Sequence, residues 1–197
     1  MSRSALVATA ILFGVSPSTS DLATLLRPGM ELVYTSNGQD QPPWRIDSVR
    51  HDPTLRTGSV CAVIHQRRGP EQTPAEETRL CIAHDTLYGW NADRSEWRAQ
   101  RPVGPRMVFE FNRPNGDKVR YETIDTREEQ ISGLTIPVVL TTVTTTDSLG
   151  RPKRRLRERY SIGLATATGG VFEIPDSSQA GSWRTQQTFE LREIRTP

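Results

Sequence analysis

The sequence predicts an all-β protein, an antiparallel meander that forms a curved sheet, a half-barrel or an open barrel, with at most one short N-terminal helix. Runs of alternating apolar and polar residues recur about every 8 to 12 residues, and turn-forming residues separate them. No apolar pattern with helical spacing continues for four turns. Because a twisted sheet of about ten strands rarely stays flat, we expect it to curl.

A secretory signal peptide is predicted at residues 1–20. Arg3 supplies the positive start, residues 5–15 form an apolar run, and small residues precede Asp21 where a signal peptidase would cleave. A transmembrane anchor is the alternative, but eleven helical residues span about 16 Å against a hydrocarbon core of about 30 Å. We therefore expect a periplasmic or secreted protein with one β domain, residues 21–197, and no transmembrane span in the mature chain.

The charge balance does not point to a polyanionic partner. The whole chain has 25 Lys and Arg residues against 23 Asp and Glu residues, and residues 1–20 contain only one of them, Arg3. The mature chain is therefore close to neutral. We expect no nucleic acid partner.

Cys61 and Cys81 are predicted to form a structural disulfide. They lie in two strand-like segments, and a hairpin centred near Glu71 would place them opposite each other, about 4.5–5.5 Å apart. A small, even number of cysteines in an exported protein usually forms bridges. A loop of about twenty residues would contribute roughly 3 kcal/mol. A redox-active or metal-binding pair, the alternative, needs a shorter spacing or further ligands.

The first half of the mature chain is predicted to begin with a short helical turn over residues 21–26, capped by Asp21 and ended by Pro28 and Gly29. Strands follow, separated by Asn-Gly, Asp-Pro and other turn-forming pairs. These expected strands are residues 30–36, 44–51, 59–66 and 78–84.

The second half is predicted to contain the longest hairpin, with about ten residues in each arm. Residues 101–105 read as a connector, and Gly163 and Gly169-Gly170 are expected to mark a bend or bulge. The expected strands are residues 87–90, 107–111, 119–124, 126–131, 135–146, 153–162, 171–174 and 183–194.

Two parts of the chain resemble exported bacterial proteins of unknown function. Residues 26–36 begin LRPGMELVY, which is similar to the start L-x-x-G-x-x-W/Y-x-Y of such proteins. The long hairpin, with ERYSIGL at 158–164 and GVFE at 170–173, is similar to their closing strands, so that the second matching part covers 134–194. The resemblance implies a curved antiparallel half-barrel, related in shape to the periplasmic lipoprotein carriers, and it brings no catalytic motif.

Four aromatic residues are the predicted lining of a ligand site: Trp44, Tyr88, Trp90 and Trp97. Such side chains combine a large apolar body with a polar tip, so plugging a barrel end is the alternative. The first function hypothesis is an exported, soluble binding protein that holds a lipid or other hydrophobic ligand on its concave face. Binding would be driven by burial of apolar surface, at about 25 cal/mol per Å².

A basic surface is predicted on one strand face, formed by Lys153, Arg155, Arg157 and Arg159. The alternating side chains Leu156, Tyr160 and Ile162 then face the core. The basic face could meet lipid phosphates or an acidic partner, or its charges could pair with carboxylates of neighbouring strands. The second function hypothesis is a structural or interaction protein of the cell envelope that docks a protein partner without catalysis.

Neither catalysis nor metal binding is indicated by a motif. His51 and His84 each precede an aspartate at a strand end, and these four side chains could form a metal site. The alternative is that they are solvated residues at exposed strand ends. The three histidines, His51, His65 and His84, show no H-x-H or H-x-x-x-H spacing. No G-x-S-x-G turn is present, and both cysteines are expected to be oxidised. We expect no enzyme, no cofactor and no metal site.

Overall fold

The computed structural model describes residues 21–69, 75–179 and 181–197, and the predicted signal peptide lies outside them. Short 3₁₀ turns are the only helical structure in the described residues, so the predicted all-β antiparallel fold is confirmed. The strands are β1 (Glu31–Ser36), β2 (Gln39–Asp40), β3 (Trp44–His51), β4 (Val60–Arg68), β5 (Glu76–Ala83), β6 (Thr86–Asn91), β7 (Glu96–Pro102), β8 (Val108–Asn112), β9 (Lys118–Ile131), β10 (Leu134–Thr146), β11 (Pro152–Ser161), β12 (Thr166–Pro175) and β13 (Trp183–Arg195).

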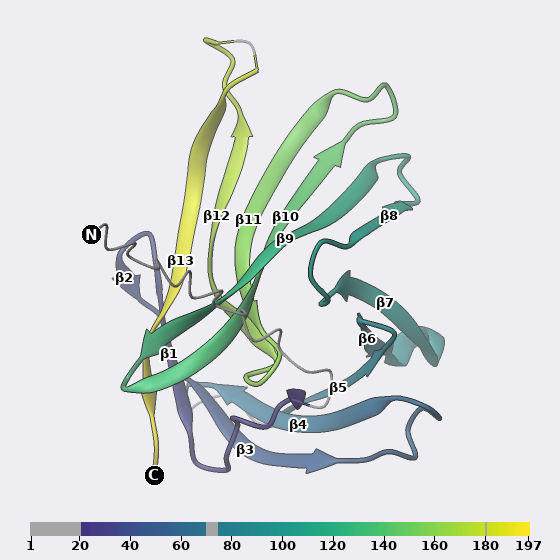
Figure 1. The fold of residues 1–197 in the computed structure, drawn as a ribbon. Coiled ribbons are helices and arrows are strands. Elements are labelled where there is room, and N and C mark those ends of the chain that lie inside the picture. The colour runs from purple at the N-terminus through teal and green to yellow at the C-terminus, as the bar shows by residue number, and fades with distance from the viewer. Residues whose placement is uncertain (1–20, 70–74, 180) are drawn as a thin grey trace, which may run out of the picture.

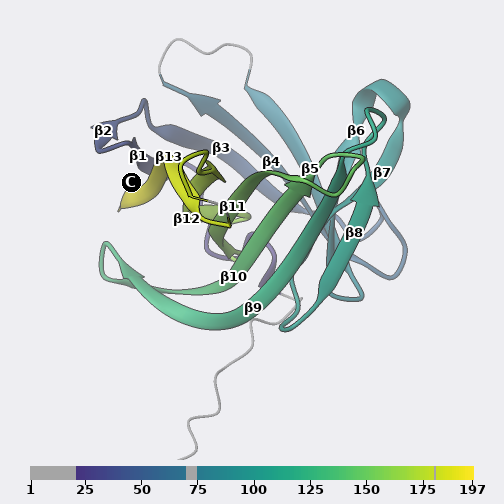
Figure 2. The ribbon, with the colours of Figure 1, turned by 90° about the horizontal axis from the view of Figure 1, so that it is seen from above.

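All thirteen strands belong to one sheet, in which the two ends of the chain meet in the middle. The order is β7-β6-β5-β4-β3-β1-β13-β12-β11-β10-β9-β8, and the two-residue β2 pairs with β1. Strands that are neighbours in the sheet are also consecutive along the chain, with two exceptions. β1 pairs with β13, and β1 pairs with β3 because the short β2 lies between them in the sequence. The strands follow one another around a ring, and β7 returns beside β8 (Figures 1 and 2). The sheet is therefore a nearly closed barrel whose seam lies between β7 and β8.

Apolar side chains from both halves of the barrel share one core. Ile46 of β3, Ile82 of β5 and Ile136 of β10 are all at most 2% exposed, and they belong to the same cluster. This agrees with the period-2 patterning of the sequence, which turns every second side chain inward. No helix in the described part of the chain is long and apolar enough to cross a bilayer.

The segment before β1 packs into this core. Leu22, Ala23 and Leu26 are buried, and the backbone N–H groups of Ala23 and Leu25 donate to the carbonyls of Ile162 and Gly163, both at 2.9 Å. Turns rather than a regular helix cover residues 22–25. The start of the described chain is thus held by main-chain hydrogen bonds and apolar packing.

The β4–β5 hairpin carries the predicted disulfide. Cys61 lies directly opposite Cys81 in the antiparallel register, and their sulfurs are 2.04 Å apart. The prediction is confirmed, and the bridge joins two neighbouring strands of the sheet.

Bulges change the side-chain alternation on several strands, β9 and β12 among them. Residues 119–124 and 126–131, expected as two strands, form the single strand β9, with Ile124 as an extra residue opposite β10. On β12 the register shifts beside Gly169, as predicted, and Thr168 has no opposing residue. A Cβ on Gly170 would lie 2.7 Å from the Phe189 ring, so this glycine permits close approach to β13.

Candidate functional site

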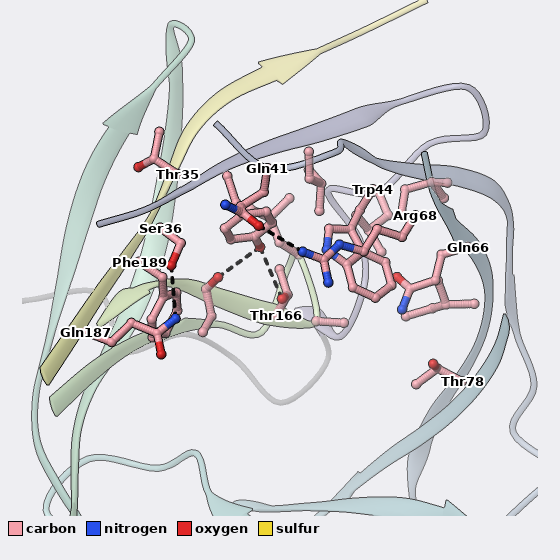
Figure 3. Close-up of a pocket in the computed structure, with 18 residues that line it drawn as sticks. Thr35, Ser36, Gln41, Trp44, Gln66, Arg68, Thr78, Thr166, Gln187 and Phe189 are labelled. Carbon is pink, nitrogen blue, oxygen red and sulfur yellow. Dashed lines mark hydrogen bonds between the residues drawn. The ribbon is translucent and has the colours of Figure 1, made fainter. Parts of the chain in front are cut away.

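A cavity of about 400 Å³ opens on the core-facing side of the sheet, between β1, β3, β4 and the β12–β13 pair (Figure 3). Its floor is apolar and continuous with the core, since Leu32, Ile46 and Ile64 belong to both. The partly buried side chains of Trp44 and Phe189 form the walls. The cavity therefore offers apolar surface inside the barrel.

Polar side chains line the rest of this cavity. They come from six separate parts of the chain: Tyr34, Thr35, Ser36, Gln41, Gln66, Arg68, Thr78, Thr166 and Gln187. Apart from Arg68, none of these described lining residues carries a formal charge. The cavity is thus amphipathic, with an apolar floor and hydrogen-bonding groups around it.

Hydrogen bonds hold several of these polar groups in place. The Tyr34 hydroxyl donates to the Ala167 carbonyl at 2.9 Å and lies 3.2 Å from the Thr166 Oγ1, and Gln187 Nε2 donates to Ser36 Oγ at 2.9 Å (Figure 3). Burial raises the pKa of Tyr34 to about 12, against a smaller lowering by the Thr166 hydrogen bond. The phenol is therefore neutral at physiological pH and presents a dipole, not a charge.

Trp44 and Arg68 form one side of the cavity. They are directly opposite each other in the β3–β4 register, and the Arg68 guanidinium carbon lies 5.9 Å from the centre of the Trp44 ring system. Arg68 Nη2 also donates to Gln41 Oε1 at 3.1 Å. The ring and the amide together orient the guanidinium at the cavity wall, as Figure 3 shows.

The other three aromatic residues of the predicted lining lie on β6 and β7, not on β3 with Trp44. Trp90 and Trp97 face each other across β6 and β7 with ring centres 5.4 Å apart, and Tyr88 lies under the guanidinium of Arg56 at 3.6 Å. The described lining of the cavity includes none of these three. Of the four, the structure therefore brings Trp44 alone to the cavity, and the three others lie on β6 and β7.

The predicted basic surface is paired with carboxylates outside β11. Lys153 contacts Asp117 at 3.0 Å, and Arg155 and Arg157 both contact Glu173, at 2.7 and 2.9 Å. Burial raises the pKa of Glu173, but the hydrogen bonds from these two arginines outweigh it, and the pKa lies below its usual value.

Arg159, the fourth basic residue, contacts Glu129 at 2.9 Å and Glu190 at 3.2 Å. Ion pairs therefore occupy all four basic side chains. This is the arrangement that the alternative interpretation of the basic stripe expects.

A buried ion pair is the feature that sequence reasoning missed. Arg101 Nη1 of β7 donates to Glu158 Oε1 of β11 at 2.5 Å, and the same guanidinium lies 4.3 Å from the Tyr160 ring centre. Burial raises the pKa of Glu158, and Arg101 opposes that shift. The signal in the sequence was Glu158 itself, which lies between Leu156 and Tyr160 on the face predicted to meet the core.

A hydrogen-bonded chain also crosses β3, β4 and β5. His65 Nδ1 lies 2.9 Å from Ser48 Oγ, and His65 Nε2 lies 3.0 Å from Glu77 Oε2. The side chains of His65 and Glu77 are both 40% exposed, and Glu77 also accepts from Arg79. We interpret this chain as cross-strand pairing on an exposed face. The described residues contain no group of three or more metal-ligating side chains.

Comparison with known proteins identifies similar folds but gives no activity. No protein-family model and no curated protein matches the sequence. Among solved structures, the chain is similar to a candidate exported protein with a YMCC-like fold from Bacteroides fragilis, with TM-score 0.50 and 8% identity over 89% of this chain and 99% of that one. A candidate lipoprotein from Parabacteroides distasonis gives TM-score 0.46 and 14% identity over 91% and 100% of the two chains. The expected resemblance to exported proteins with a curved antiparallel sheet is confirmed at the level of the fold.

Proposed function

We propose that the protein is an exported carrier that holds a hydrophobic or amphipathic small molecule, such as a lipid or acyl chain, inside the barrel. The cavity beside Trp44 is the observation that carries this proposal, because it joins apolar core surface to fixed hydrogen-bonding groups. A periplasmic or secreted location is supported by the leader-like residues 1–20, by the Cys61–Cys81 bridge and by the fold that the chain shares with an exported protein.

The volume of the cavity limits the size of the ligand that it can hold. Ligand pockets generally measure about 300–1,000 Å³, so a cavity of about 400 Å³ is at the small end. One acyl chain or a small amphiphile fits this range better than a lipid with two chains. Contact with Trp44 and Phe189 would remove apolar surface from water and supply the main driving force.

Native mass spectrometry of protein purified from the periplasm of its expression host, before and after organic extraction, tests the proposal. A lipid-sized adduct that extraction removes is the expected result. The variant Ala167→Phe fills the cavity wall and should lose the adduct, while Ala99→Phe on β7, away from the cavity lining, should keep it. A bare wild-type mass, together with no uptake of a fluorescent fatty acid by the extracted protein, would reject the carrier function.

The exposed edge of the sheet favours a second candidate, a cell-envelope protein that docks a partner without catalysis. On β8 and the adjoining β9, Val108, Phe111 and Ile124 are 51%, 37% and 56% exposed. An edge strand presents unpaired backbone groups, so an extended segment of another protein could add as the next strand. Photocrosslinking from position 108 in intact cells should then trap one discrete partner, and crosslinking from the exposed Leu149 should not.

A further inference from the structure

We infer that the ligand of the barrel is an amphiphile with an uncharged, polyhydroxylated head group, as in a glycolipid, and that this head group lies along the inner wall of β4–β7. The inference rests on the proposed carrier function and specifies its ligand. It concerns the polar part of the molecule, which the carrier function alone leaves open.

Two further cavities continue the one beside Trp44 toward the seam. A second cavity, of about 380 Å³, shares Thr78 of β5 with the first, and a third, of about 520 Å³, shares Gly89 and Gln100 with the second. Phe111 of β8 lines the third cavity, so the series ends at the seam. From β4 to β7 the path crosses three strand spacings, about 14 Å. A ligand whose apolar end lies beside Trp44 therefore has room for a long polar end.

Three uncharged hydrogen-bonding side chains follow this path. Gln66 and Thr78, both half-buried, lie at one side of the first cavity (Figure 3), and the exposed Gln100 joins the second cavity to the third. The Gln100 amide lies over Gly89, in the space that a Cβ would take. None of the three side chains has a hydrogen-bond partner within the part of the chain that the structure describes. Their donors and acceptors are thus available to a ligand.

The chemistry of these groups matches that of hydroxyls. Amide and hydroxyl side chains both donate and accept hydrogen bonds, as a sugar hydroxyl does, so each can pair with a hydroxyl in either sense. An ether head group offers acceptors almost alone. A site with such groups favours a ligand that carries hydroxyls over one that lacks them, because binding of the latter removes water from the site without replacing its hydrogen bonds.

Charged side chains beyond the first cavity do not favour an ionic head group. Arg79, which lines the second cavity, is paired with Glu77 at 2.7 Å. Arg98, which lines the third, is paired with Glu96 at 2.6 Å. Glu76 also lines the second cavity. A head group of either sign would meet side chains of its own sign, and an uncharged head group avoids this repulsion.

Binding of three ligands with the same dodecyl chain, below their critical micelle concentrations, tests the inference on the extracted mature protein. Dodecyl maltoside carries sugar hydroxyls, octaethylene glycol monododecyl ether carries mainly ether oxygens, and dodecanoate carries a charge. We expect dodecyl maltoside to bind at least about 10-fold more tightly than the other two, as for two or more hydrogen bonds of ordinary strength. Equal or tighter binding of the ether or of dodecanoate would overturn the head-group inference and leave the carrier function standing. Binding of none of the three would reject the carrier function itself.

Substitutions along the path locate the head group. Gln66→Met and Gln100→Met should each lower the preference for dodecyl maltoside over dodecanoate by about 2- to 10-fold, with dodecanoate binding unchanged. Gln186→Met on β13 is the matched control, because Gln186 is exposed and lies outside the described lining of all three cavities. Circular dichroism of each variant confirms folding. A preference that survives both substitutions would overturn the placement of the head group on β4–β7.

Free maltose separates a glycolipid from a soluble sugar. Because maltose lacks the chain that contacts the apolar floor, we expect it to bind at least about 10-fold more weakly than dodecyl maltoside. Maltose that binds as tightly as dodecyl maltoside would reject the carrier function and leave the sugar-binding groups on β4–β7 as the site.

Discussion

At the scale of single residues, Arg101 and Glu158 form an ion pair inside the barrel that is stable only when both partners are charged. Their side chains are 19% and 3% exposed, and they join β7 at the seam to β11 in the opposite part of the sheet. Removing a charge from water is unfavourable, so such a pair is stable only while both partners are present. Tyr160 under the guanidinium adds a cation–π contact.

Replacing Arg101 by Met should lower the free energy of unfolding by about 3–5 kcal/mol at pH 8. Without Arg101, the pKa of Glu158 in the folded protein rises further above its unfolded value, because burial then acts unopposed. A carboxyl whose pKa is raised by folding contributes stability that is present below the unfolded pKa and is lost as the pH rises through the folded pKa. The deficit should therefore be larger at pH 8 than at pH 5, as measured by urea unfolding.

The double variant Arg101→Met/Glu158→Gln separates this electrostatic effect from lost packing. It removes the titrating carboxyl, so its stability deficit relative to the wild type should no longer grow with pH. An equal deficit of Arg101→Met at pH 5 and pH 8 would show that the ion pair contributes by packing alone.

Residue-level reasoning from the sequence reached Trp44 but not the polar side chains around it. Those side chains lie on strands that are far apart in the sequence, and a local pattern does not show which strands face one another across the barrel. The alternation within β3 is also interrupted, because the register shifts between Ile46 and Ser48. Trp44 and Ile46 face the cavity, Val49 packs against the core, and Asp47 breaks the alternation between them. A period of two cannot be continued through a bulge whose position the sequence does not reveal.

At the scale of elements, the segment before β1 is part of the core and not a flexible tail. The sequence indicated a helical turn there, but whether the turn packs inside the barrel depends on its neighbours. Leu22 is fully buried, and the adjacent backbone donates hydrogen bonds to the turn that follows β11. The strands themselves were predictable because half-buried antiparallel strands impose an alternating pattern on local sequence.

Leu22→Ala should therefore destabilise the protein by about 2–5 kcal/mol, the usual cost of truncating a buried leucine. Leu149→Ala provides the matched control, because Leu149 is 75% exposed and its loss should change stability by about 0.5 kcal/mol or less. Thermal or urea unfolding of the two variants under identical conditions measures the difference. Equal stabilities would mean that the segment contributes little to the folded core.

At the scale of the whole molecule, a meander can place its seam between any two consecutive strands. The sequence predicts the neighbours β3–β4–β5 or β9–β10–β11 and a connector at residues 101–105, but it does not show that the barrel opens at that connector. The pairing of β1 with β13 joins residues more than 150 positions apart. Long-range pairing of this kind depends on how the whole sheet curls, which local patterns do not contain.

Amide hydrogen exchange should reveal the seam directly. β10 and β12 are hydrogen-bonded to strands on both sides, whereas β7 and β8 each have one partner in the described sheet, so about half of their amide groups lack a strand to bond with. Peptides from β8 should therefore exchange faster than peptides from β12. β1 lies near the start of the domain but should exchange slowly, because β13 pairs with it on one side and β3 and β2 pair with it on the other. Slow exchange throughout β8 would show that a further strand covers the edge, and fast exchange throughout β1 would contradict the pairing of the two chain ends.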